Sequence, residues 1–262
     1  MPTERFTVQS KDGVVISVQK AGSGPALLLI HGSLLNGTLS WAAVLGRLAK
    51  RFTVYVMDRR GREPSGDAKQ YSIVNEADDI VAVVEAIGGP VVVLSHSYGA
   101  LASIAALDRL KTVAHLILYE PPVFFDRPDS DAAIASLERA LEASDREGIV
   151  TSFLRDQVRA PAERIAMMRS SPIWPIALQI APTLPRESRA ANTYRPSMER
   201  LGMWKTPTTV LLGSETTGLL RDAAFGIRDA IPGCRMVVLE GQGHGAMLDA
   251  PEYFANKILE IA

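Results

Sequence analysis

Short hydrophobic runs alternate with helical patterns along most of the chain. Residues 26–30 (ALLLI) are continuously apolar between Gly24-Pro25 and Gly32, which is typical of a strand buried on both faces of a parallel sheet. In the segment 75–87 apolar side chains recur at helical spacing, and Gly88-Gly89-Pro90 ends it. The alternation predicts an α/β fold with a doubly wound parallel sheet. Strands are expected at 14–18, 26–30, 53–57, 91–94, 115–119, 208–212 and 236–239, and helices at 41–50, 75–87, 100–109, 220–230 and 251–261.

The pattern changes between residues 123 and 205. No strand is expected there, and helices are predicted at 132–143, 149–158 and 162–168. The stretch 171–185 holds four prolines, a density that excludes one long helix. We therefore expect a core domain made of residues 1–122 and 206–262, interrupted by a mostly helical domain at 123–205.

Composition narrows the class of protein. Of the 262 residues 47% are hydrophobic and 22% charged, as in globular proteins with a substantial core. The formal net charge of −1 gives no electrostatic reason to expect nucleic acid or a membrane as a partner, and a small molecule is expected instead. The longest apolar runs are too short to cross a bilayer, and the N-terminus lacks the apolar region of a signal peptide. With Cys234 as the only cysteine, a cytoplasmic location is expected; the oligomeric state stays open.

The segment Ser95-His96-Ser97-Tyr98-Gly99 is the strongest candidate for chemistry. It lies between a predicted strand and a predicted helix, the context in which a G-x-S-x-G-type motif is meaningful. The sharp turn requires small residues on both sides of the serine, and Ser95 and Gly99 meet this requirement although Ser95 departs from the usual glycine. A serine before a helix is otherwise read as an N-cap. In this context Ser97 is the expected nucleophile.

Five segments together resemble the α/β-hydrolase superfamily over nearly the whole chain. They are Leu29-Ile30-His31-Gly32-Ser33, Met57-Asp58-Arg59-Arg60-Gly61-Arg62, Ser95-His96-Ser97-Tyr98-Gly99, Leu118-Tyr119-Glu120-Pro121-Pro122 and Gly241-Gln242-Gly243-His244. The resemblance implies the α/β-hydrolase fold: a mostly parallel eight-stranded sheet flanked by helices, with a helical cap inserted after strand 6. It implies the branch of the superfamily that uses a serine nucleophile. For the 58–62 segment we expect salt bridges that support the structure rather than contact with substrate.

The base and the acid are sought among histidines and carboxylates. His244 follows the last predicted strand in a glycine-rich loop, where the resemblance places the base. Many relatives carry an aspartate after the penultimate strand in a G-x-x-D pattern, but here that position is Thr216. A minority place the acid after the sixth strand, where this chain has Glu120. Burial of a carboxylate there is energetically unfavourable unless the carboxylate is paired. We expect Glu120 to be the acid, with Glu215 as the alternative and an ion pair with Arg59 as the non-catalytic interpretation of Glu120.

The resemblance also implies an oxyanion hole and a substrate pocket. The expected donors are the backbone N–H groups of Tyr98 and Ser33, with Leu34 as an alternative to Ser33. His31 is implied to shape the loop that carries Ser33. Apolar side chains of the cap are expected to line the pocket over Ser97 or to pack the cap on the core. The pocket candidates are His31, Leu34, Phe124, Trp174 and Met247.

These residues predict a hydrolase that cleaves an ester, thioester or lactone of a fairly apolar small molecule through an acyl-enzyme, and no cofactor or metal is expected. A serine nucleophile argues against the epoxide hydrolases and haloalkane dehalogenases of the superfamily, which use aspartate. Two alternatives stay open: a lyase or cyclase on the same scaffold, and a small-molecule receptor that retains the fold. A receptor has no need of both Ser97 and His244, and fold alone does not decide the reaction.

Overall fold

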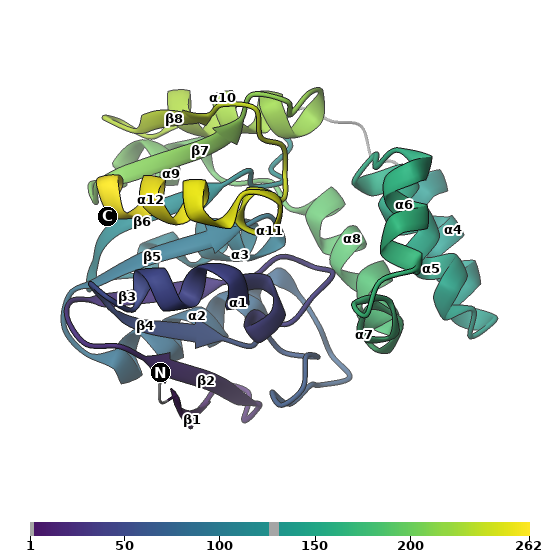
Figure 1. Cartoon of the computed structure of the whole chain (residues 1–262), viewed down its shortest axis with the longest axis horizontal. Coiled ribbons are helices and arrows are strands. Elements are labelled where there is room, and N and C mark those ends of the chain that lie inside the picture. Colours follow the sequence, from purple (N-terminus) through teal and green to yellow (C-terminus); the bar gives the residue numbers. More distant parts are fainter. Residues whose placement is uncertain (1–2, 126–130) are drawn as a thin grey trace.

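The computed structural model describes residues 3–125 and 131–262, which form one eight-stranded sheet of order β1-β2-β4-β3-β5-β6-β7-β8 (Figure 1). Strand β2 pairs antiparallel with both β1 and β4, and the other neighbouring strands pair in parallel. The doubly wound sheet expected from the sequence is therefore confirmed. The strands are β1 (Thr3–Gln9), β2 (Val15–Ala21), β3 (Ala26–Ile30), β4 (Thr53–Met57), β5 (Val91–His96), β6 (Val113–Tyr119), β7 (Thr208–Gly213) and β8 (Arg235–Leu239).

Helices cover both faces of the sheet and explain its apolar central strands. Side chains of β3 point alternately to the two faces, and Leu27 to Ile30 are all fully buried. One face packs against α2, α3 and α10, and the other against α1 and α12 (Figure 1). The bounds are α1 (Gly37–Leu48), α2 (Ile73–Ile87), α3 (Tyr98–Ala106) with the 3₁₀ turn η1 (Leu107–Arg109), α10 (Leu219–Ala230), α11 (Ala246–Asp249) and α12 (Pro251–Ile261).

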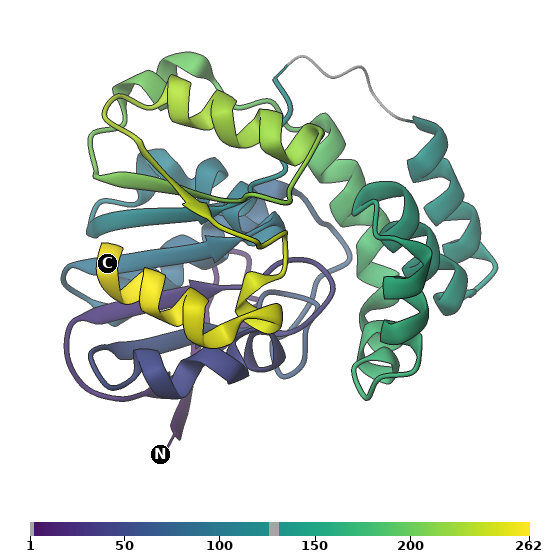
Figure 2. The same ribbon diagram turned by 45° about the horizontal axis from the view of Figure 1, so that its top comes forward.

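The segment between β6 and β7 is helical in the part that the structure describes. It contains α4 (Asp131–Glu142), α5 (Arg146–Ser152), the π-helical turn η2 (Phe153–Gln157), α6 (Ala162–Arg169), α7 (Trp174–Ile180), the 3₁₀ turn η3 (Ala181–Thr183), α8 (Leu184–Thr193) and α9 (Met198–Met203). We call helices α4 to α8 the cap. Figures 1 and 2 show the cap as a separate layer beside one end of the sheet. It has an apolar cluster of its own, built around Leu137, Ile149 and Leu184.

Five helices and strands were absent from the sequence prediction: β1, α7, α8, α9 and α11. Strand β1 lies at the sheet edge with mostly exposed residues, so its pattern lacks a buried face. Three of the five buried residues of helix α8 are polar (Glu187, Ser188 and Asn192), so apolar residues do not mark its buried side. The prolines of the 171–185 stretch lie near the starts of α7 and α8 and in η3 between them, so no single α-helix spans it. In the described part of the chain, no helix has the length and apolar character needed to cross a bilayer.

Candidate active site

Ser97 lies on the turn between β5 and α3. Its φ of 52° is a left-handed conformation that is strained for a residue with a side chain, and its N–H donates to the Tyr119 carbonyl at 2.9 Å. Position 99 must be glycine, because a Cβ there would lie 2.5 Å from the His31 carbonyl oxygen. Ser95 is fully buried, and its small side chain is accommodated where relatives carry glycine. The strand, turn and helix around Ser97 lie where the sequence predicted them.

A chain of hydrogen bonds connects three residues that are distant in sequence. His244 Nε2 lies 3.0 Å from Ser97 Oγ, and His244 Nδ1 lies 2.6 Å from Glu120 Oε2. An ionised carboxylate can only accept, so Nδ1–H donates to Glu120 and Nε2 is free to accept the Ser97 hydroxyl proton. In such an arrangement the imidazole can act as a general base while the carboxylate fixes its tautomer and stabilises the imidazolium.

Glu120 directly follows β6 and is completely buried, with a φ of 47°. Its N–H donates to the Leu211 carbonyl at 3.2 Å. Carboxylate oxygen Oε1 accepts from the Gly213 N–H at 2.8 Å and from the Thr216 hydroxyl at 2.6 Å. Together with His244 on Oε2, three donors compensate the burial of this carboxylate. Arg59 does not supply the pairing; it binds Glu76 and Glu187 instead.

The structure separates the two candidate acids. The Glu215 side chain is exposed to solvent, and its backbone N–H donates to the Gln242 carbonyl at 2.9 Å. Glu120, not Glu215, contacts His244. Thr216 is a residue that the sequence reasoning noted only as a departure from the usual aspartate. Its hydroxyl donates to the Glu120 carboxylate, which follows the neighbouring strand β6. The absence of aspartate at position 216 was the one sign in the sequence that this residue has a different role.

The loop that carries His244 is held from two sides. The Tyr119 hydroxyl donates to the Gly243 carbonyl and accepts from the Ala246 N–H at 3.2 Å. His96 Nε2–H donates to the His244 carbonyl at 2.9 Å, and the two imidazole centroids lie 4.5 Å apart. Burial, together with the neighbouring His244, keeps the pKa of His96 well below 6.5, so His96 stays uncharged beside the base. The sequence analysis did not foresee this contact.

The predicted oxyanion donors belong to the start of α3 and to the loop after β3. Tyr98 is the first residue of α3, so the helix offers its N–H no acceptor, and the helix dipole favours negative charge there. Ser33 follows the His31-Gly32 pair in a loop after β3. The His31 ring connects this loop to the segment after β4: Nδ1–H donates to the Gly32 carbonyl at 2.7 Å, and Nε2 accepts from the Arg59 N–H at 3.0 Å. Burial and the charges of Arg59 and Arg62 hold the pKa of His31 well below 6.5. The donor roles of Ser33 and Tyr98 stay predictions.

Three of the five pocket candidates have packing roles. His31 is 0% exposed with both ring nitrogens bonded, so it shapes the loop. Trp174 is 6% exposed inside the cap cluster, where its Nε1–H donates to Glu147. Met247 is 2% exposed in the core beneath the His244 loop. In the structure the side chains of these three residues are taken up by packing and hydrogen bonds, and their contact with substrate stays a prediction.

The other two pocket candidates are less buried. Leu34 is half-buried and packs against the cap cluster. Phe124 is half-buried in the segment that leads from β6 toward the cap. Their contact with substrate stays a prediction. Within residues 3–125 and 131–262, no group of three or more histidine, cysteine or acidic side chains is arranged to hold a metal ion.

Comparison with known proteins agrees with this geometry. The chain is 28% identical over 257 residues to an uncharacterized protein of Mycobacterium tuberculosis, covering 90% of this chain and 74% of that protein. It is 25% identical to a pimeloyl-[acyl-carrier protein] methyl ester esterase of Aeromonas hydrophila, covering 93% of this chain and 97% of the esterase. The crystal structure of an alpha/beta hydrolase from Sphaerobacter thermophilus superposes with a TM-score of 0.86 at 33% identity, over 97% of this chain and 99% of that one.

A family profile described as the alpha/beta hydrolase family matches residues 27–257. That range begins in β3, includes the cap and ends within α12, so it contains Ser97, Glu120 and His244. The chain therefore belongs to the alpha/beta hydrolase family.

Proposed function

We propose that this protein is a serine hydrolase that cleaves a carboxylic ester, thioester or lactone of a fairly apolar small molecule through an acyl-enzyme. The observation that carries the proposal is the continuous chain from Ser97 Oγ through His244 to Glu120, with contacts of 3.0 and 2.6 Å. A serine hydroxyl is a poor nucleophile until a positioned base takes its proton, and this chain supplies that base and its orienting acid.

In the first half of the proposed reaction, Ser97 Oγ attacks the substrate carbonyl as its proton moves to His244 Nε2. The imidazolium is stabilised by Glu120, and the oxyanion is stabilised by the N–H groups of Tyr98 and Ser33. His244 then protonates the leaving group, which departs as an alcohol, thiol or, from a lactone, the tethered hydroxyl. In the second half, His244 deprotonates water, which attacks the acyl-enzyme and releases the acid and free Ser97.

Two observations support the substrate class. Leu34, next to the proposed oxyanion donor Ser33, packs against the apolar cluster of the cap, which supports an apolar acyl group. The Aeromonas hydrophila relative is by its name an esterase for a methyl ester. We infer a carboxylic ester as the first substrate type to test.

A fluorophosphonate probe and a panel of p-nitrophenyl esters of increasing acyl length test the proposal, with wild type and Ser97→Ala side by side. We expect wild type to be labelled and to turn over at least one ester, and Ser97→Ala to lose both. Ser103→Ala is a matched control, because Ser103 is buried in α3 and its hydroxyl bonds only to the Gly99 carbonyl one turn earlier.

The other outcomes separate the rival functions. Labelling without turnover of any ester would favour a lyase or cyclase that uses the same residues for acid–base chemistry. A wild-type protein that is neither labelled nor active would refute the nucleophile and favour a receptor.

A further inference from the structure

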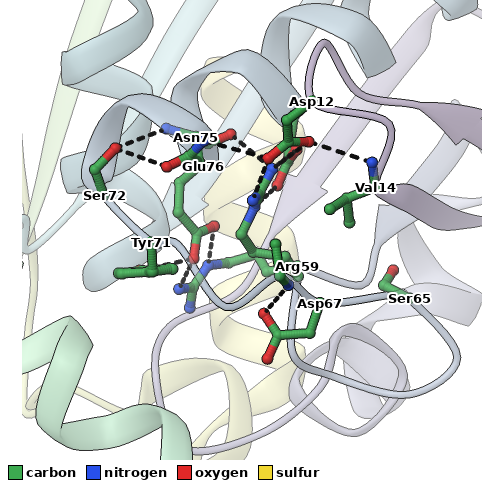
Figure 3. A network of polar contacts seen from close by, with 12 residues as sticks. Asp12, Val14, Arg59, Ser65, Asp67, Tyr71, Ser72, Asn75 and Glu76 are labelled. Atoms are coloured by element: carbon green, nitrogen blue, oxygen red, sulfur yellow. Dashed lines mark hydrogen bonds and ion pairs between the residues drawn. The ribbon is translucent and has the colours of Figure 1, made fainter.

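A buried cluster of charges lies beside the candidate oxyanion loop, outside the Ser97–His244–Glu120 chain. Arg59 and Arg62 follow β4, Glu76 lies in α2, and Glu187 lies in α8 of the cap; each is at most 1% exposed. Arg59 binds Glu76 through Nε at 3.0 Å and Nη2 at 2.7 Å, which Figure 3 shows together with Tyr71 beside the pair. Two cations and two anions make the cluster neutral.

Glu187 is the contribution of the cap to this cluster. Its Oε1 pairs with Arg62 and lies 3.1 Å from Arg59 Nη2. Burial alone would raise the pKa of Glu187, but the two guanidinium groups outweigh it and hold the pKa below the ordinary value. Glu187 is therefore an ionised residue of the cap that is paired with two arginines of the core.

The same two arginines hold the carbonyl groups of the oxyanion loop. Arg59 Nη1 donates to the Gly32 carbonyl at 2.9 Å, and Arg62 Nη2 donates to the Ser33 carbonyl. A peptide unit is planar, so fixing its carbonyl also fixes the N–H on its other side. The Gly32 carbonyl shares a peptide unit with the Ser33 N–H, and the Ser33 carbonyl shares one with the Leu34 N–H. The arginines therefore orient both candidate donors of this loop.

Tyr98, the other proposed oxyanion donor, contacts the cluster as well. The Arg59 guanidinium lies 4.6 Å from the centroid of the Tyr98 ring. A hydrogen bond of 2.7 Å joins the hydroxyls of Tyr98 and Tyr71, and the Tyr71 hydroxyl donates to Glu76 at 2.9 Å. One cluster thus contacts both residues whose N–H groups are the proposed donors.

We propose that Glu187 is a positioning residue for the oxyanion hole, through which the docked cap holds Arg62 and Arg59 on the carbonyls of the Ser33 loop. The inference rests on the proposed hydrolase function, since it assigns a cause to oxyanion stabilisation in that reaction. In this proposal the cap also supports the oxyanion hole. Without α8 in place, Arg62 loses its carboxylate partner, and the N–H groups of the Ser33 loop lose their fixed orientation.

Two variants test the proposal with the p-nitrophenyl ester that wild type cleaves best. Glu187→Gln removes the negative charge and keeps the shape; we expect kcat to fall about 10²-fold with KM within about threefold, because the oxyanion forms only in the transition state. Affinity for a trifluoromethyl ketone, which forms an oxyanion on Ser97, should fall in proportion to kcat/KM. Glu199→Gln, the same change at an exposed residue of α9, should leave all three quantities unchanged.

Glu187→Gln leaves a buried cation in excess and can destabilise the fold, so a second variant removes the ion pair as a unit. Arg62→Met combined with Glu187→Leu keeps the cluster neutral, and replacement of a buried pair by apolar side chains of similar size commonly preserves folding. We expect thermal stability close to wild type together with the loss of kcat. Wild-type kcat in this double variant would show that Glu187 only balances charge, and would overturn the proposal.

Failure of the proposed function gives a different result. A wild-type protein without turnover or labelling would overturn both proposals, whereas an active wild type with an equally active double variant would overturn only this one.

Discussion

Replacement of Glu120 by glutamine is the sharpest test of the candidate triad. The carboxylate has two different sides: Oε1 accepts from Gly213 N–H and the Thr216 hydroxyl, and Oε2 accepts from His244 Nδ1. An amide has one oxygen and one NH₂ group. Because the Gly213 N–H can only donate, the amide oxygen of Glu120→Gln is expected at the Oε1 position. The NH₂ group then faces His244.

That orientation selects the wrong tautomer of the base. With NH₂ donating to Nδ1, the proton of a neutral imidazole lies on Nε2, which can no longer accept the Ser97 proton. In a serine triad of the same logic, replacing the acid by its amide lowers kcat about 10⁴-fold. A 10⁴-fold loss corresponds to about 5 kcal/mol of transition-state stabilisation, and we expect a loss of this size here.

Steady-state kcat/KM on the best p-nitrophenyl ester and the rate of fluorophosphonate labelling measure the effect. Thermal unfolding of the same samples shows that the variant is folded. The matched control is Glu215→Gln, a solvent-exposed carboxylate on the next loop, which should keep wild-type kinetics. If Glu120→Gln retains activity within tenfold of wild type, or if Glu215→Gln is the more impaired, the assignment of the acid is wrong.

Three further outcomes are expected. Thr216→Val removes one donor to the acid carboxylate and should lower kcat at least tenfold, whereas Thr216→Ser should restore most of it; equal kinetics of the two variants would contradict the contact. His31 and His96 have pKa values held well below 6.5 mainly by burial, so the unfolded chain binds protons that the folded one does not, and stability must fall as pH drops below 6.5. Between pH 7.5 and 5.5 each histidine should lower the free energy of unfolding by up to about 1.4 kcal/mol, measurable by urea unfolding, and a flat pH profile would refute this. Gly99→Ala places a Cβ 2.5 Å from a backbone carbonyl and should abolish labelling or folding, whereas Gly46→Ala, whose Cβ meets nothing within 4 Å, should behave as wild type.

The sequence predicted best the elements that carry their own pattern. Strands β3 (Ala26–Ile30) and β4 (Thr53–Met57) have the predicted bounds, because a run of apolar residues between turn residues marks a buried strand without any knowledge of its neighbours. Strand β1 was missed because an edge strand has little buried surface to create a pattern. Helix α8 was missed because most of its buried residues are polar, and the burial of Glu187 depends on arginine partners from the core.

The candidate site divides along the same line. Ser97 and His244 can be identified from the sequence around them. A strained turn requires small residues beside Ser97, and glycines surround His244 in its loop. The residues next to Glu187 give no sign of its role, because its partner Arg62 is 125 positions away in sequence and only folding brings the two together. Likewise, Trp174 is buried in the cap cluster and Met247 in the core cluster, and the spacing of apolar residues in the sequence does not show this.

The position of the acid follows from the pairing of two adjacent strands. Tyr119 of β6 lies opposite Leu211 of β7 in parallel register, so a carboxylate just after either strand reaches the same edge of the sheet near His244. If Glu120 after β6 is the acid, the usual acid position after β7 is free for another residue, and in this chain Thr216 occupies it. Its hydroxyl, with the Gly213 N–H, faces Glu120 and compensates a negative charge that is buried completely. The glutamate after β6 and the threonine after β7 therefore form one arrangement, because Thr216 supplies a hydrogen bond to the buried carboxylate that our proposal assigns as the acid.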